Sequence, residues 1–203
     1  MPSSVQPPAS ASVEAGSVPG LTYLPDYIGA EAEKHLLGII DELPWLDALQ
    51  RRVQHYGYRY DYKARKVVPE MYLGPLPDWA AQLAVRLHRD GRFERVPDQL
   101  IVNEYQPGQG ISKHVDCVPC FGPTVASLSL GSGCALEMAN KKAGLKVALA
   151  LAPRSLLVLQ QEARYQWTHA VPARKKDMVG GKTAVRGRRV SLTFRTVLTE
   201  RVA

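Results

Sequence analysis

The feature that most constrains the fold of this chain is the residue pattern that begins after about residue 96. Short runs rich in Val, Leu, Ile, Thr and Tyr follow one another there, and breaks of Gly, Pro and Asn such as PGQG, NKKAG and APRS separate them. Runs of this kind are typical of β-strands, and the breaks are typical of turns. Because no long helical pattern lies between the runs, the sequence predicts two packed sheets, as in a β-sandwich or jelly roll.

The N-terminal half carries helical patterns instead. Apolar residues recur at helical spacing from Gly29 to Leu49, with an interruption at Pro44, and a second helix is expected from Pro77 to Gly91. Together with the strands, these helices predict an α+β fold in which a helical layer supports a β core. We divide the chain into a mobile tail, an N-terminal part, and a core that forms one structural unit with that part: residues 1–20, 21–95 and 96–203.

The composition indicates a globular protein with an excess of positive charge. Of its 203 residues, 45% are hydrophobic and 22% are charged, and the formal net charge is +7. That excess favours a polyanionic partner, with nucleic acid the first candidate. Three cysteines are too few for a disulfide framework, no apolar run is long enough to span a membrane, and the N-terminus lacks the apolar centre of a signal peptide. We therefore expect a cytoplasmic monomer that does not contact a membrane.

The short stretch SKHVD carries the first indication of chemistry. Side chains alternate in an extended segment, so His114 and Asp116 project to the same side and can reach one metal ion. They are either ordinary polar residues at a strand edge or two of three metal ligands, with His169 on a late strand as the candidate for the third. Two histidines and one carboxylate leave coordination positions open, which suits non-haem Fe(II) oxygenases.

The last strand, RVSLTFR, bears a second indication. Arg189 and Arg195 share one face with two small polar residues, while Val, Leu and Phe occupy the other face. Buried guanidinium groups need anionic partners, and arginine binds a carboxylate through two parallel hydrogen bonds. A small dicarboxylate is such a partner, and Asn103 and Tyr105 could donate to the same ligand. The alternative is an exposed strand face, on which arginine needs no ligand.

Four segments together resemble the AlkB-like Fe(II)/2-oxoglutarate-dependent dioxygenases: NEYQPGQGISKHVD, SLSLGS, PRSLLVLQQEARYQWTHAVP and RVSLTFR. The resemblance is close over residues 96–198 and loose before them. It implies a double-stranded β-helix (jelly roll) core with a nucleotide-recognition lid, and it implies Fe(II), 2-oxoglutarate as cosubstrate, and O2. The residues that it implies as iron ligands, which are also the catalytic residues, are His114, Asp116 and His169.

The same resemblance implies the cosubstrate contacts. Arg189, with Tyr105, would bind the far carboxylate of 2-oxoglutarate. Arg195, with Asn103, would lie near its C1 carboxylate and near the Asp116 ligand. Ser191 stands where some members of the family carry Asn, and we include it among the cosubstrate-binding candidates.

A tyrosine-rich segment in the N-terminal half is the candidate for substrate binding. In HYGYRYDY the tyrosines recur at every second position, so a strand would place all four rings on one face, with Arg59 and other cations around them. Rings can stack on an exposed base while cations hold phosphates; the alternative is an edge strand that uses tyrosine for packing. The substrate-binding candidates are therefore Tyr56, Tyr58, Tyr60, Tyr62 and Arg59.

Two further segments have open interpretations. The basic stretch ARKKDMVGGKTAVRGRR is expected to be a flexible loop beside the site, which either grips phosphates or is simply solvated. Cys117 and Cys120 form a Cys-x-x-Cys pair that could bind zinc or cycle with thiols. Because no second pair exists, we expect both cysteines to be incidental.

The resemblance implies an oxidative demethylase of alkylated bases such as 1-methyladenine and 3-methylcytosine in DNA or RNA. Hydroxylation of an N-methyl group would release formaldehyde, with succinate and CO2 as the other products. The partner would be single-stranded or flipped-base DNA, or RNA. One alternative is a tRNA hydroxylase that acts on a wobble uridine side group, because GYRYDY and PRSLLVLQQEARYQWTH are similar to a eukaryotic AlkB homologue with that activity. Another is a non-catalytic nucleic-acid-binding module.

Overall fold

The computed structural model describes residues 18–47 and 49–198, and it carries mostly antiparallel sheets with few helices. Most of the predicted tail lies outside the described residues. Its last predicted residues do not: Val18 is only 2% exposed and packs among core residues. The packed part of the described chain therefore already includes Val18, rather than beginning after residue 20.

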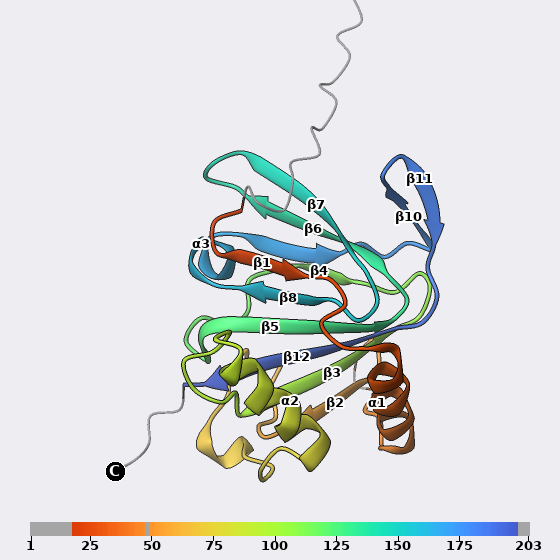
Figure 1. Ribbon diagram of the computed structural model, residues 1–203. Helices are drawn as coiled ribbons and strands as arrows, with labels where there is room; N and C mark the ends of the chain where they lie inside the picture. The colour runs from red at the N-terminus through yellow and green to blue at the C-terminus, as the bar shows by residue number, and fades with distance from the viewer. Residues whose placement is uncertain (1–17, 48, 199–203) are drawn as a thin grey trace, which may run out of the picture.

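The larger sheet has six strands and is the central layer of the fold (Figure 1). All of its pairings are antiparallel. In sheet order the strands are β1 (Leu21–Leu24), β8 (Leu156–Leu159), β5 (Phe121–Gly131), β12 (Arg189–Val197), β3 (Gln99–Tyr105) and β2 (Val53–Tyr56). The central position of β12 explains why nearly all of its residues are buried.

The smaller sheet has four strands, which also pair antiparallel. In sheet order they are β4 (Ile111–His114), β9 (Thr168–Val171), β6 (Cys134–Asn140) and β7 (Leu145–Leu151). In β7 buried and exposed residues alternate, so Val147, Leu149 and Leu151 point inward. These residues pack with Leu157 and Leu159 of the larger sheet, which joins the two sheets through a shared apolar core.

Two helices cover the other face of the larger sheet. They are α1 (Ala30–Glu42) and α2 (Asp78–Arg89), and Figure 1 shows both against the strands at its lower edge. Their inward residues, such as Ile40 and Leu87, pack on Leu100 and Leu192 of the sheet. Helix α1 ends before Pro44, as the sequence predicts, because proline cannot continue the backbone hydrogen bonding. The predicted α+β jelly roll with supporting helices is confirmed.

Three local elements complete the described chain. A 3-10 turn, η2 (Pro69–Met71), lies between β2 and α2, and a short helix, α3 (Gln161–Tyr165), precedes β9. The basic stretch expected to be a loop is an antiparallel hairpin, β10 (Lys176–Val179) with β11 (Lys182–Val185). Asp177 fixes this hairpin: it accepts hydrogen bonds from Arg174, Arg186 and the Ala135 amide of β6. No described helix is long and apolar enough to cross a membrane.

Candidate iron and cosubstrate site

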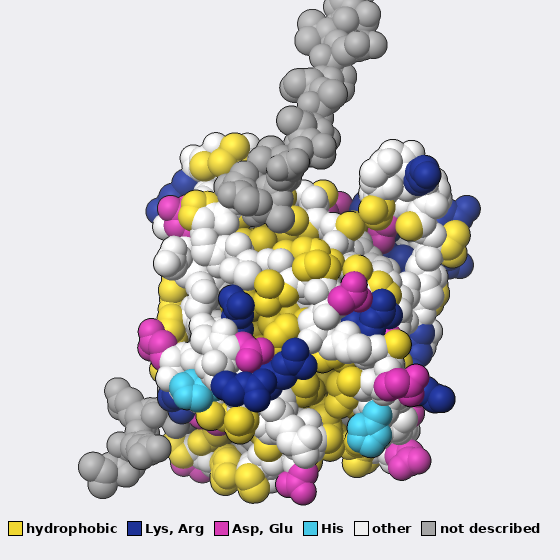
Figure 2. Space-filling view, viewed as in Figure 1, with side chains coloured by type: hydrophobic (Ala, Val, Ile, Leu, Met, Phe, Trp, Pro, Cys, Tyr) yellow, Lys and Arg dark blue, Asp and Glu magenta, His cyan; other side chains and the backbone are white. Residues whose placement is uncertain are grey.

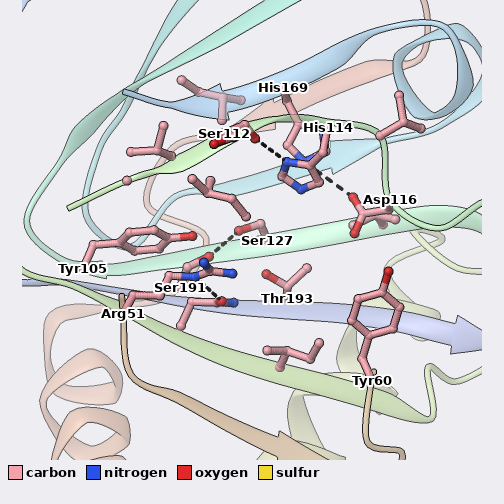
Figure 3. Close-up of a pocket in the computed structure, with 18 of the residues that line it drawn as sticks. Arg51, Tyr60, Tyr105, Ser112, His114, Asp116, Ser127, His169, Ser191 and Thr193 are labelled. Atoms are coloured by element: carbon pink, nitrogen blue, oxygen red, sulfur yellow. Dashed lines mark hydrogen bonds and ion pairs between the residues drawn. The ribbon is translucent and has the colours of Figure 1, made fainter. Parts of the chain in front are cut away.

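Two histidines face each other across neighbouring strands. His114 at the end of β4 pairs in register with His169 of β9, and their ring centroids lie 4.3 Å apart (Figure 3). The His114 Nδ1 donates to the carbonyl oxygen of Ser112 at 2.8 Å. Since Nδ1 carries the proton, the lone pair of His114 is on Nε2 and is available to a metal ion.

Asp116 completes the group from the loop that follows β4. Its Oδ2 lies 3.4 Å from the His169 Nε2, and the side chain is almost fully buried. Arg195 of β12 donates from Nε to the Asp116 Oδ1 at 2.9 Å and from NH1 to Gln99 at 3.1 Å. Burial opposes ionisation of Asp116, but the positive charge of Arg195 outweighs burial and holds the pKa of the carboxyl well below its usual value.

The donor set fits Fe(II). One ligand atom from each of His114, Asp116 and His169 lies within 4.8 Å of the other two. Burial lowers the pKa of His169 to about 4, an effect that Asp116 partly opposes, so this imidazole is neutral near pH 7. Two neutral imidazoles and one carboxylate on one side of an ion are the ligands of non-haem Fe(II) oxygenases. The structure thus brings the three sequence-predicted ligands together.

Arg189 is a buried cation that lacks an anionic partner among the residues that the structure describes. It is 4% exposed, and one guanidinium nitrogen donates to the Ser129 hydroxyl at 2.9 Å. Its Nε has no hydrogen-bond partner, and no ion pair of Arg189 occurs within the described residues. The guanidinium lies 5.3 Å from the ring centroid of Tyr105, its cross-strand neighbour on β3. A carboxylate between the two side chains would satisfy a buried charge that is otherwise costly.

Asn103 and Ser191 also reach the site, but each already has a protein partner. They are cross-strand neighbours on β3 and β12. The Ser191 hydroxyl lies 2.8 Å from the hydroxyl of Ser127, and the side-chain Oδ1 of Asn103 accepts a hydrogen bond from the Arg51 Nε at 2.9 Å. The five cosubstrate residues indicated by the sequence therefore all lie around one site, although their contacts with 2-oxoglutarate stay predictions.

These side chains line a single cavity of about 730 Å³ between the two sheets. That volume is typical of a site that encloses a small organic ligand. Apolar residues of the shared core form one wall, and they are Val125, Leu136, Leu151, Leu157 and Leu159. Cations also contribute: Arg51, Arg65 and Lys113 line the cavity together with Arg189 and Arg195.

The four tyrosines of the candidate lid segment (residues 55–62) do not share one face. The expectation that all four rings point the same way is wrong. Tyr60 and Tyr62 line the cavity, and their ring centroids lie 5.0 Å apart. Tyr56 instead packs edge-on against Trp79 of α2, and Tyr58 packs against Tyr72. The alternation stops because β2 ends at Tyr56 and Gly57 follows with a φ of +76°. A side chain at Gly57 would meet the Asp98 carbonyl, so only glycine fits this turn.

Arg59 is exposed and does not line the cavity, so its predicted role in substrate binding has no support from its position. Arg51 lines the cavity although it was not among the site residues expected from the sequence, and Gln99 supports the site from behind. Arg51 stood in a basic run attributed to phosphate contacts, yet it points at Asn103 and Tyr105. Gln99 is fully buried behind Arg195, and a glutamine in a strand carries no signal of that contact.

The two cysteines that follow Asp116 are joined by a disulfide, which the sequence did not predict. Cys117 and Cys120 are both buried, and they pack with Phe121, Val67 and Tyr60. The disulfide therefore lies on the loop that carries Asp116 and packs against the lid segment through Tyr60. The expectation that these residues are incidental is wrong, because their disulfide makes a structural contact at the site.

Comparison with known proteins assigns the chain to a class. A model of the 2OG-Fe(II) oxygenase superfamily matches residues 20–195, and the chain belongs to this superfamily. The structure of OsALKBH1 superimposes with a TM-score of 0.68 at 16% identity, over 88% of this chain and 97% of that one. At this identity the match shows a shared fold.

Sequence relatives narrow the class. The uncharacterized protein L905 of Acanthamoeba polyphaga mimivirus is 37% identical over 93% of this chain and 90% of its own length. The ALKBH8 homolog of Arabidopsis thaliana, named an alkylated DNA repair protein, is 38% identical over 89% of this chain but 59% of its own length. Mouse ALKBH8, named a tRNA (carboxymethyluridine(34)-5-O)-methyltransferase, is 34% identical, and the chain spans only 30% of it. The AlkB-like resemblance is confirmed.

Proposed function

We propose that this protein oxidises an alkyl group on a nucleic-acid base, and that removal of methyl groups from alkylated bases is one such reaction. Bound Fe(II) and 2-oxoglutarate supply the oxidising chemistry, in which O2 hydroxylates a C–H bond and succinate and CO2 form. The chain's own residues bind the cosubstrate, orient the base and exclude water. Succinate formation that depends on a nucleic acid is the central expectation.

The observation that carries the proposal is the charge and aromatic content of one cavity. Among the described residues that line it, Asp116 is the only carboxylate, and Arg195 already pairs with it. Arg65 and Lys113 line the same cavity as Tyr60 and Tyr62, and neither cation has a carboxylate partner within the described chain. The guanidinium of Arg51, a third cation of the cavity, lies 6.0 Å from the ring centroid of Tyr62. Cations next to aromatic rings suit a nucleotide, because phosphates pair with the cations and a base stacks on a ring.

The opposite, helix-covered face has a different character. Figure 2 shows Lys and Arg side chains mixed there with Asp and Glu side chains. Several are joined in ion pairs, such as Arg154 with Asp26 and Glu33, and Arg86 with Asp90. These ion pairs neutralise part of the positive charge on that face, which favours the cavity side as the nucleic-acid surface.

A second candidate reaction is hydroxylation of a wobble uridine side group in tRNA. The relatives of 34 to 38% identity include proteins named ALKBH8, and the mouse protein's name specifies carboxymethyluridine at position 34 of tRNA. Relatives named as demethylases, such as zebrafish ALKBH6 and a Caenorhabditis elegans DNA N6-methyl adenine demethylase, are 27% identical. At the higher identities one relative is named for tRNA and one for repair of alkylated DNA, so these names support tRNA hydroxylation as the second candidate beside demethylation.

One assay separates the candidates. The protein is incubated with Fe(II), 2-oxoglutarate and, in parallel, 1-methyladenine-bearing single-stranded DNA, the same lesion in RNA, and total tRNA; succinate, formaldehyde and nucleoside masses are measured. Formaldehyde with an unmethylated base supports demethylation. A uridine derivative that gains one oxygen, without formaldehyde, supports tRNA hydroxylation. Binding without succinate on any substrate would contradict both reactions and favour the non-catalytic module.

The variant His114→Ala is the control for the iron site. It removes one ligand and should abolish iron-dependent succinate formation on every substrate. Nucleic-acid binding should persist, because the lid segment does not contain His114. Unchanged turnover in this variant would rule out the metal assignment.

A further inference from the structure

Asp116 differs from the two histidine ligands in how its backbone is held. His114 and His169 lie on paired strands, so the strand ladder itself fixes the distance between their backbones. Asp116 lies two residues beyond the end of β4, in the loop that leads to β5, and it has no ladder partner among the described strands. Some other contact must hold the third ligand at the correct distance from His169.

Arg164 makes that contact. It belongs to α3, five positions before His169 on the same short stretch of chain, and it is 1% exposed. Its NH1 donates to the backbone carbonyl oxygen of Asp116 at 3.0 Å, and its NH2 donates to the carbonyl oxygen of Cys117 at 3.3 Å. The chain segment that carries the His169 ligand therefore hydrogen-bonds to the backbone of the Asp116 ligand.

The same guanidinium also holds the far end of the loop. Its NH2 donates to the carbonyl oxygen of Phe121 at 3.2 Å, and its Nε donates to that of Gly122 at 3.3 Å, both at the start of β5. Arg164 thus closes the loop between β4 and β5 at both ends. Among the described residues it forms no ion pair with a carboxylate, so backbone carbonyls are its main partners.

We propose that Arg164 is a positioning residue that fixes the distance between the Asp116 and His169 iron ligands. Arginine suits the task because its planar fork presents five N–H donors in fixed directions, whereas a lysine ammonium presents three donors from one atom. The side-chain carboxylate of Asp116 is held separately by Arg195. Arg164 at the backbone and Arg195 at the carboxylate together determine where the ligand oxygen lies.

The inference rests on the iron site and not on which nucleic acid is oxidised. It can therefore be tested without a nucleic-acid substrate, and failure of the proposed reaction would leave it untouched. Supporting contacts behind metal ligands commonly change metal affinity by about 10- to 100-fold when they are removed. We expect an effect of that size on metal binding rather than on cosubstrate binding.

The variants are Arg164→Lys and Arg164→Gln. Arg186 offers the matched control, because it is also a buried arginine, and it holds Asp177 and the Pro172 carbonyl oxygen at the base of the β10–β11 hairpin. Arg186→Lys and Arg186→Gln should lower stability in a similar way without touching the Asp116 loop. Thermal unfolding of all four variants measures that common cost.

Metal affinity is measured by titration with Co(II), whose visible absorption reports the coordination geometry. The Arg164 variants should bind Co(II) about 10-fold or more weakly and with an altered spectrum, while the Arg186 variants stay within about twofold of the parent protein. At saturating Fe(II), the KM for 2-oxoglutarate should change by no more than about twofold in all four.

Three results would overturn the proposal. The first is parental Co(II) affinity and spectrum in a folded Arg164 variant. The second is an equal loss of affinity in the Arg186 variants, which would trace the effect to general destabilisation. The third is failure of both Arg164 variants to fold while both Arg186 variants fold, since Arg164 would then support the whole fold rather than the ligand distance.

Discussion

Arg188 and Arg189 are adjacent in sequence, yet they have different chemical tasks. Arg188 points outward and pairs with Glu104 and Asp41. Arg189 points into the cavity, next to Tyr105, with its Nε unpartnered. Successive side chains of an extended segment point to opposite faces, so Arg188 forms ion pairs outside the cavity while its neighbour Arg189 faces the ligand site.

At the residue scale, Arg189→Lys should raise the KM for 2-oxoglutarate by about 10- to 100-fold. Lysine keeps the charge but loses the two-pronged contact with a carboxylate, and charge-assisted hydrogen bonds contribute about 1.5–3 kcal/mol. Initial rates of succinate formation at fixed Fe(II) measure this. Arg188→Lys is the matched control and should leave that KM unchanged. Equal values for both variants would contradict the role of Arg189.

Single residues also show what the sequence could reveal. The face shared by Arg189 and Arg195 follows from period-two alternation, and the structure buries both residues as expected. The contacts of Arg164 could not be found in this way. Its partners are backbone carbonyls, which every residue carries, so no pattern of side chains records them.

At the scale of elements, the lid segment departs most from its sequence pattern. Tyr56 ends β2, and the turn at Gly57 sends the next tyrosines in different directions. The turn exists because the chain crosses close to the Asp98 carbonyl, a long-range contact that the local alternation cannot reveal. Helix α3 was missed for another reason: five residues are too short to show a helical period.

Tyr60 and Tyr62, rather than all four tyrosines, should therefore bind the substrate. Leucine at either position should weaken binding of a single-stranded oligonucleotide by about 10-fold or more, because stacking of one base contributes about 1–3 kcal/mol. Uncoupled turnover of 2-oxoglutarate should stay within about twofold. Fluorescence anisotropy and succinate assays measure the two effects.

Tyr56→Leu is the control for that experiment. Its ring packs against Trp79, away from the cavity, so the variant should lose stability and keep oligonucleotide affinity. If Tyr56→Leu weakened binding as much as the two cavity tyrosines did, the segment would be structural throughout.

The β10–β11 hairpin depends on one carboxylate. Asp177 is 3% exposed, and burial is outweighed by Arg186 and Arg174, which lower the pKa of the carboxyl to about 2. Asp177→Asn should cost about 3–5 kcal/mol, since it leaves the buried guanidinium group of Arg186 without its anion. Urea unfolding measures this cost, and limited proteolysis should cut first within residues 174–186. A variant with parental stability would show that the hairpin does not need the ion pair.

At the scale of the whole molecule, two half-buried or buried histidines govern stability in acid. Burial lowers the pKa of both His55 and His169 to about 4. An unfolded chain takes up these protons near pH 6.5, so between about pH 6.5 and 4 the unfolded state binds more protons than the folded state. The stability of the metal-free protein is therefore full above pH 6.5 and falls as the pH drops toward 4.

Each histidine should remove about 2 kcal/mol from the free energy of unfolding between pH 7 and pH 5. Urea unfolding in the presence of a chelator measures the change. His55→Gln should recover about half of the loss, because it leaves the iron ligands in place. A free energy that is equal at the two pH values would contradict the shifted pKa values.

The cross-strand pairing of His114 with His169 has a consequence for metal selectivity. Backbone pairing between β4 and β9 sets the distance between the two histidine backbones, which limits how far the imidazoles can adjust to the ion that arrives. Nitrogen ligands at a fixed distance bind Co(II), Ni(II) and Zn(II) more tightly than Fe(II). Selection of Fe(II) over these ions then depends on which free ions surround the protein. Preparations from zinc-rich media should be inactive until the bound zinc is exchanged for Fe(II).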